Sequence, residues 1–203
     1  YKGSHSGTLF EGGIGPLGST LCEQLQAQGI TTGRLRQVVI THAHPDHVMA
    51  VPALREAYPE AQIVASEPAA KTLAVEKAVS FFCKMDDGLT GALAEAGLID
   101  QSQRRPAMTE STISIDRVLK RDDRIEVDEG VFYRVLETPG HSDCSLSFHD
   151  PGNHVLIISD ATGYYMPEHD WWWPNYFTDY AAYLDSINRL SEIGAQVLCL
   201  SHN

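Results

Sequence analysis

Long apolar runs, paired cysteines and basic clusters are all missing from this sequence, and each absence excludes a class of protein. No apolar stretch approaches the roughly 18–20 residues of a membrane-spanning helix, so we expect no membrane partner. Lys and Arg number 15 against 27 Asp and Glu, which gives a net charge of −12. Because nucleic acids and anionic lipids attract clustered Lys and Arg, we expect neither as a partner.

The four cysteines, Cys22, Cys83, Cys144 and Cys199, are scattered, with no C-x-x-C pair. Cys144 and Cys199 stand among apolar residues, which indicates small core residues. No signal peptide is visible and nothing demands an oxidising compartment, so we predict a cytoplasmic location. The chain starts at Tyr1 rather than Met, and we expect a fragment that has been trimmed at both ends.

The sequence does have an ordinary globular composition and one dense group of titratable residues. With 203 residues, 43% hydrophobic and 21% charged, it predicts a single domain over residues 1–203. In His42-Ala43-His44-Pro45-Asp46-His47, four potential metal ligands fall within six residues, directly after the apolar run 38–40. Neutral imidazole and carboxylate bind zinc and divalent iron or manganese. The alternative, a solvated loop that happens to be rich in His, is much the weaker interpretation.

Helices and strands alternate over the first 65 residues, which predicts an α/β layered fold. Thr20 and Glu23 form a capping box for a helix that Gly29 ends. Pro52 suits the start of a second helix, and Pro59 its end. Strands are expected at 8–10, 36–41 and 62–65.

Residues 67–112 are expected to form a helical insertion, with helix-favouring stretches at 69–82 and 89–98. Two roles are equally open. The insertion is either a peripheral helical pair that covers the sheet or a cap that shapes the substrate pocket.

From Ile113 onward the pattern predicts strands, with one last helix that Thr178 caps. Three further ligand candidates, His141, Asp160 and His202, each follow one of these strands. Any one of them alone would be interpreted as structural. Their coincidence with the first motif is the strong indication, because ligand sites commonly gather at strand ends. The strands are expected at 113–115, 125–127, 131–137, 144–149, 154–159 and 196–200.

The spacing His42-x-His44-x-Asp46-His47, with the three downstream residues, resembles the signature of the metallo-β-lactamase superfamily of metallohydrolases. The resemblance runs from Leu9 to His202. It implies that family's four-layer αβ/βα sandwich and two divalent metal ions, zinc first, with iron or manganese as alternatives. It also implies the ligands: His42, His44 and His141 for one ion, Asp46, His47 and His202 for the other, and Asp160 bridging both.

Three positions narrow the branch that the resemblance implies. Asp160 stands where the common zinc β-lactamases carry a thiolate, which favours the glyoxalase II and lactonase branch over antibiotic hydrolysis. Residues 48–50 stand where many glyoxalase II enzymes have Gly-Gly, so the chain departs from those enzymes there. His44 stands where flavo-diiron proteins usually have Glu, which disfavours that oxygen-reducing branch. Segments 11–14 and 140–143 are similar to the thioesterase-like, quinolone-signal-response members.

The implied function is a binuclear metal-dependent hydrolase, in which a metal-bridging hydroxide attacks a thioester, ester or lactone. Asp46 would bind the second ion and orient this nucleophile. Two alternatives stay open: a di-iron redox or oxygen-binding protein, and a metal-stabilised binding or effector module.

Several residues outside the motifs carry expectations of their own. Three consecutive tryptophans, 171–173, cannot all enter one core, so at least one is expected in a pocket or a subunit interface. This favours a small-molecule substrate with an apolar or acyl part and allows a homodimer. Tyr164 and Tyr165 either bind a developing oxyanion or pack in a loop. Surface positions are expected for His5, His149, His154 and His169.

Overall fold

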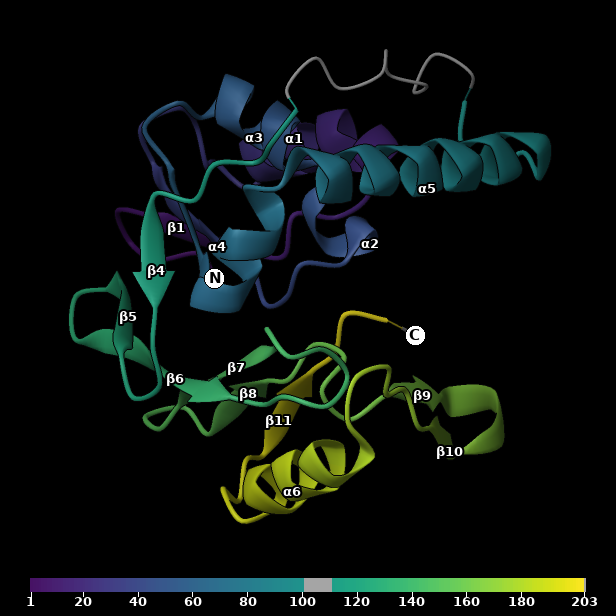
Figure 1. The fold of residues 1–203 in the computed structure, drawn as a ribbon. Coiled ribbons are helices and arrows are strands. Elements are labelled where there is room, and N and C mark those ends of the chain that lie inside the picture. The colour runs from purple at the N-terminus through teal and green to yellow at the C-terminus, as the bar shows by residue number, and fades with distance from the viewer. Residues whose placement is uncertain (101–110, 203) are drawn as a thin grey trace. The chain divides into compact units, whose positions relative to one another are not determined.

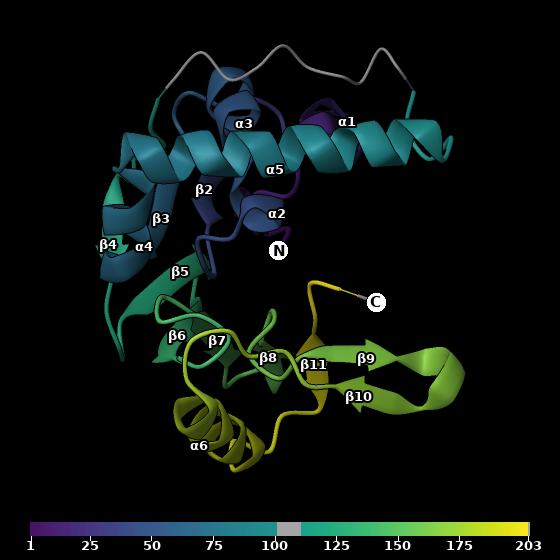
Figure 2. The ribbon, with the colours of Figure 1, turned by 45° about the vertical axis from the view of Figure 1, so that its right-hand side comes forward.

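The computed structural model describes residues 1–100 and 111–202, which divide into two compact units (Figures 1 and 2). The first unit comprises Tyr1–Ala65 and Ala69–Val118, and the second comprises Ser66–Pro68 and Leu119–Asn203. Each unit contains a sheet together with helices, so the predicted α/β class is confirmed.

The first unit is built on a four-stranded sheet in the order β1-β2-β3-β4. β2 pairs in parallel with both β1 and β3. Val38, Val39 and Ile40 are completely buried, as expected of a parallel strand that is covered on both faces. The strands span β1 (Gly7–Phe10), β2 (Leu35–Val39), β3 (Gln62–Ser66) and β4 (Arg117–Leu119).

Three of the predicted helix ends are confirmed and one is wrong. Gly29 has φ +76°, the left-handed conformation expected after a helix, and Pro52 lies in the first turn of its helix. That helix ends at Ala57 with Tyr58 as its C-cap, directly before Pro59. The capping box is wrong, because α1 begins at Gly18 with Leu17 at its N-cap and no side-chain cap. The elements here are η1 (Gly15–Leu17), α1 (Gly18–Ala27), α2 (Pro45–Val48) and α3 (Val51–Ala57).

The predicted helical insertion contains α4 (Glu67–Leu73) and α5 (Glu76–Glu95). α5 joins the second half of the stretch 69–82 to most of the stretch 89–98 in one helix. Positions 101–110 of the predicted insertion lie outside the described residues. Asp86, in its middle, accepts a hydrogen bond from the Gly15 N–H at 2.9 Å. Among residues 1–100 and 111–202, no helix has the length and apolarity that crossing a membrane requires.

The second unit is built on a five-stranded sheet in the order β11-β8-β7-β6-β5. β5 to β8 form an antiparallel meander, and β11 joins β8 in parallel. A turn joins β7 to β8, and Asp150 accepts hydrogen bonds there from the N–H groups of Gly152 and Asn153. The strands span β5 (Arg124–Asp128), β6 (Val131–Glu137), β7 (Leu146–Asp150), β8 (Val155–Ile157) and β11 (Val197–Cys199).

Helix α6 (Tyr180–Ser191) packs on this sheet through Leu190, which joins a buried cluster with Leu156 and Ile158 (Figure 1). Its cap differs from the prediction. Asp179 is the N-cap and accepts the Ala182 N–H at 2.9 Å, because a carboxylate at this position satisfies a helical donor. The Thr178 hydroxyl instead donates to the Gly140 carbonyl.

A hairpin that the sequence analysis did not predict extends from the second unit's sheet (Figure 2). It consists of β9 (Tyr164–Met166), η3 (Pro167–His169) and β10 (Trp171–Trp173). All three tryptophans are exposed on it. The expectation that they do not share one core is therefore confirmed.

Candidate metal centre

In the first unit, the His-rich motif occupies the loop after β2 and the short helix α2. His44 is the N-cap of α2, with extended φ −90° and ψ 152°, and Pro45 follows at the first helical position. This turn from extended to helical backbone gathers the motif's side chains. The ring of His42 lies 4.6 Å from that of His44 and 4.0 Å from that of His47.

Glu11, directly after β1, orients two of these histidines at once. Its Oε2 lies 2.9 Å from Nδ1 of His47, and its Oε1 lies 2.6 Å from the Thr41 hydroxyl. A carboxylate accepts only, so the Nδ1–H of His47 and the hydroxyl of Thr41 both donate to it. The Thr41 oxygen then accepts from Nδ1 of His42 at 3.0 Å.

The hydrogen bonds at Nδ1 leave Nε2 as the ligand atom of His42 and of His47. This is the usual arrangement of metal-binding histidines, in which an outer acceptor fixes the tautomer and the ring orientation. Asp46 Oδ2 lies 3.5 Å from Nε2 of His47. Two atoms that bind one tetrahedral ion at about 2.1 Å would lie roughly 3.4 Å apart, so this spacing fits a shared ion.

In the second unit, one carboxylate oxygen of Asp160 lies near the rings of both His141 and His202. Asp160 Oδ2 lies 3.5 Å from Nε2 of His141 and 3.6 Å from Nε2 of His202. Charge-assisted hydrogen bonds are shorter, about 2.7–2.9 Å, whereas ligands around a zinc ion have this longer spacing. His141 and Asp160 are 1% and 3% exposed, so uncompensated charge there would be costly.

His141 is held from its other side by the Asn175 carbonyl, which lies 2.9 Å from Nδ1. A carbonyl accepts only, so Nδ1 carries the proton and Nε2 faces Asp160 with its lone pair. The Asn175 N–H donates to the Tyr183 hydroxyl at 3.2 Å. Burial raises the pKa of Tyr183, which keeps this hydroxyl protonated.

The turn that presents His141 is fixed against the start of α6. Gly140 has φ +131°, and a Cβ there would lie 2.3 Å from Cα of Tyr183. The Ser186 hydroxyl donates to the Pro139 carbonyl at 2.7 Å. This close approach requires glycine at position 140.

Asp160 and His202 follow neighbouring parallel strands, β8 and β11, so both emerge at the same edge of the sheet. The hydroxyls of Ser159 and Ser201, one residue before each ligand, lie 2.9 Å apart and join the two strand ends. Ser159 has φ +48°, which is unusual for a residue with a side chain and is typical of functional turns.

The seven predicted ligands thus lie in two sets, four in the first unit and three in the second. The sharing of ions between the two sets stays a prediction. Sequence reasoning missed the orienting residues Glu11, Thr41 and Asn175. Only Glu11 offered a signal, an acidic residue in a Gly-rich turn directly after a strand.

The other predicted residues have mixed outcomes. The Tyr165 hydroxyl donates to Asp170 at 2.8 Å, and this hydrogen bond raises the pKa of Tyr165, which argues against an oxyanion role. The ring of Tyr164 packs edge-on against that of His202. His149 is a correction: it is only partly exposed and its Nε2 is buried, because β7 sets it between two neighbouring strands. The other three are exposed as predicted, namely His5, His154 and His169.

Comparisons with known proteins identify the family and the fold. The family model of the metallo-beta-lactamase superfamily matches residues 3–202. An archaeal metallo-beta-lactamase superfamily protein from Sulfolobus tokodaii has a TM-score of 0.70 and 19% identity, over 99% of this chain and 71% of that one.

Two further structures are similar. A subclass B3 metallo-beta-lactamase of Bradyrhizobium japonicum has a TM-score of 0.63 and 18% identity, over 99% of this chain and 69% of that one. ETHE1 from Myxococcus xanthus has a TM-score of 0.63 and 18% identity, over 100% of this chain and 68% of that one. At these identities the likeness shows the fold, and the family model shows the membership. The chain belongs to the metallo-beta-lactamase superfamily, as its His-rich motif predicted.

Proposed function

We propose that this chain is a binuclear metal-dependent hydrolase that acts on a thioester, ester or lactone. The superfamily to which it belongs consists largely of hydrolytic enzymes. The observation that carries the proposal is the orientation of the histidines. Hydrogen bonds at Nδ1 of His42, His47 and His141 leave Nε2 as the atom through which each ring would bind a metal.

The proposed assignment of ligands follows the family motif. When bound, two divalent ions would lower the pKa of a water molecule and polarise the scissile carbonyl group. Asp160 fits the bridging position because its Oδ2 faces two Nε2 atoms at 3.5 and 3.6 Å. The complete assignment places His42, His44 and His141 on one ion, Asp46, His47 and His202 on the other, and Asp160 on both.

Asp46 is proposed to have a second role, which is to orient the attacking water. Its carboxylate is 36% exposed, whereas His47 beside it is 2% exposed. One oxygen can thus face a neighbouring ligand while the other faces a substrate. An aspartate held in this way can take up a proton from the nucleophile.

Apolar surface beside the second unit's ligands supports an acyl or otherwise apolar substrate. Phe177 is 71% exposed, and its ring lies 5.3 Å from that of His141. Trp172 lines a separate cavity of about 410 Å³ with Leu156, Leu190 and Thr162. No predicted ligand is among the residues that line this cavity, so the support for an apolar substrate comes from Phe177. Phosphodiesters are less suited to a chain of net charge −12.

The first experiment measures metal content and hydrolysis on the same preparation. Protein purified without added metal would be analysed for zinc, iron and manganese. It would then be assayed with a thioester, an ester and a lactone. We expect about two ions per chain and turnover of at least one substrate class. Asp160→Ala should lose the bound metal and the turnover.

Three other results would overturn the proposal. Two irons with oxygen consumption and no hydrolysis would favour the redox alternative. Bound metal without either activity would favour a binding or effector module. Less than one tightly bound ion per folded chain would contradict the two-metal site itself.

A further inference from the structure

Three cationic or titratable side chains lie in register on neighbouring strands of the second unit. Arg124 on β5 is the cross-strand partner of Arg134 on β6, and Arg134 is in turn the partner of His149 on β7. Side chains directly opposite one another have Cβ atoms about 4.5–5.5 Å apart, and like charges at this distance repel. We call these three residues the arginine row.

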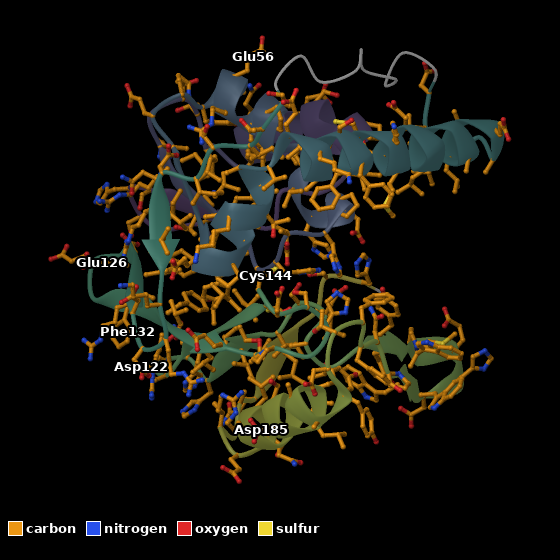
Figure 3. The ribbon with its side chains drawn as sticks, viewed as in Figure 1. Glu56, Asp122, Glu126, Phe132, Cys144 and Asp185 are labelled. Carbon is orange, nitrogen blue, oxygen red and sulfur yellow. The ribbon has the colours of Figure 1, made fainter. Side chains whose placement is uncertain are left out.

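The row borders a hollow on one face of the sheet. Strand alternation buries Ile125 and Val135 on the opposite face, while Arg124 and Arg134 are exposed. The hollow has a volume of about 440 Å³. Figure 3 labels Asp122 and Phe132 at this end of the sheet. The lining residues, none of them a proposed metal ligand, are Asp122, Arg124, Phe132, Arg134, His149 and Pro151.

The two arginines are oriented by different partners. Arg134 donates from both Nε and Nη2 to Oδ1 of Asp122. The guanidinium carbon of Arg124 lies 4.4 Å from the centroid of the Phe132 ring, so an aromatic face supports the guanidinium plane. The N–H groups of a stacked guanidinium lie in its plane, where a flat anion can meet them. Asp122 is the one acid among the six lining residues.

His149 supplies a third polar group. Its Nε2 is buried and has no hydrogen-bond partner among the residues that the structure describes. Burial is the largest influence that lowers the pKa of His149; His154 and Arg134 lower it further, and Asp150 opposes them. His149 lines the hollow, so the negative charge of an anion there would favour the protonated form of its ring.

We propose that the arginine row binds a small oxyanion, either a phosphate group or a carboxylate. Such an anion relieves the repulsion between two arginines placed directly opposite one another. Arginine also matches the geometry of both oxyanions through paired N–H donors. The chain has a net charge of −12, so two arginines and a histidine around one hollow make the electrostatic potential there more positive than over the rest of the surface.

The test is a titration of the metal-loaded chain with inorganic phosphate and, separately, with succinate, followed by NMR at the arginine side-chain N–H groups. We expect saturable shifts at Arg124 and Arg134 with one of the two anions at least. Arg124→Gln and Arg134→Gln should each weaken binding about tenfold, because each removes a charged hydrogen-bonding group. The phosphate and succinate arms identify which oxyanion is preferred.

The direction of the change in anion affinity in Asp122→Asn distinguishes a binding site from a structural ion pair. If Asp122 competes with the anion for Arg134, its neutralisation should tighten binding several-fold. If the Arg134–Asp122 pair only stabilises the sheet surface, this variant would show no gain in affinity. Arg189→Gln is the matched control, since Arg189 forms a similar pair with Asp185 at 2.8 Å on α6, and it should bind like the wild type.

A pH series with sulfate, whose charge is constant near neutrality, adds an independent readout. The charged and titratable groups around the His149 ring are Asp150, His154 and Arg134, together with Asp122 and Arg124 among the other lining residues. Binding should tighten from pH 8 to pH 6, and His149→Gln should remove that dependence. No saturable shift with any of the three anions, or equal binding in all variants, would overturn the proposal. Circular dichroism melts would confirm that each variant is folded.

Discussion

Glu11 is the residue whose removal should most directly separate metal binding from folding. It accepts two hydrogen bonds, one through each carboxylate oxygen, from His47 and Thr41. Glutamine would offer one oxygen and one N–H₂ group, so one contact would become two facing donors. We predict that Glu11→Gln lowers zinc affinity about 10–100-fold, as measured by competition with a chelator.

The control for Glu11 is Glu23→Gln, which removes an exposed carboxylate from α1 in the same unit. It should leave zinc affinity unchanged. If Glu11→Gln also binds zinc like the wild type, the orienting role of Glu11 and the tautomers assigned to His42 and His47 are wrong.

Gly140 tests the turn that presents His141. A Cβ at this position would approach the Tyr183 backbone nitrogen to 2.4 Å, and φ is +131°. Gly140→Ala should therefore lower the free energy of unfolding by more than about 3 kcal/mol, because backbone atoms must move. Gly130→Ala provides the comparison: φ is +72° there, but nothing lies within 4 Å of the new Cβ.

Urea unfolding of both glycine variants separates the steric clash from the backbone strain. The Gly130 variant should lose only about 1 kcal/mol, the usual cost of a left-handed conformation for alanine. Equal losses in the two variants would show that contact with α6 does not restrict position 140.

At the scale of elements, the contact between α5 and η1 includes Asp86, an acid whose pKa is raised. Burial raises the pKa of Asp86, Asp87 adds to this, and the hydrogen bond from the Gly15 N–H partly opposes it. The folded chain then binds a proton more readily than the unfolded chain. The free energy of unfolding therefore falls as pH rises from 3.8 through the raised pKa, and the penalty is complete at neutral pH.

Asp86→Asn keeps an oxygen that can accept from Gly15 but removes the ionisation. We predict that it stabilises the chain by roughly 0.5 kcal/mol at pH 7, a small value because the side chain is only half-buried. The gain should disappear toward pH 3. Asp87→Asn should give a smaller gain of the same sign, and thermal melts across this pH range would measure both.

The elements also show where sequence reasoning succeeds and where it fails. The alternating run Val131–Glu137 was predicted with both of its ends, because strand periodicity is local information. The continuity of α5 was missed, because Asp86, Asp87 and Gly88 favour a break in isolation. The contact of Asp86 with Gly15, 71 residues away, is not visible in a local pattern.

The candidate site divides in the same way. The ligand residues could be predicted because each is a side chain of distinctive chemistry at a strand end. Asn175 could not, because it acts through its backbone carbonyl, which every residue has. The environment of His149 depends on the register between β6, β7 and β8, which the sequence alone does not determine.

At the scale of the whole molecule, charge and metal content should act together on stability. The net charge of −12 destabilises a compact chain through self-repulsion, and two divalent cations would supply four compensating charges. The family membership and the spacing of both ligand sets therefore predict that metal removal lowers the melting temperature.

The size of this effect follows from binding linkage. Free zinc at about one hundred times its dissociation constant stabilises the folded state by about 2.7 kcal/mol per site. For a chain of this size, that corresponds to a rise in melting temperature of roughly 5–10 °C per site, or about 10–20 °C for two sites over the chelator-treated protein, measurable by differential scanning fluorimetry. Asp160→Ala should lose most of this rise, since Asp160 faces both His141 and His202. Asp185→Ala removes an exposed carboxylate from α6 and should keep the full rise (Figure 3). Equal responses of the two variants would show that zinc stabilises the chain through surface charge alone, and the two-metal site would then have no support from stability.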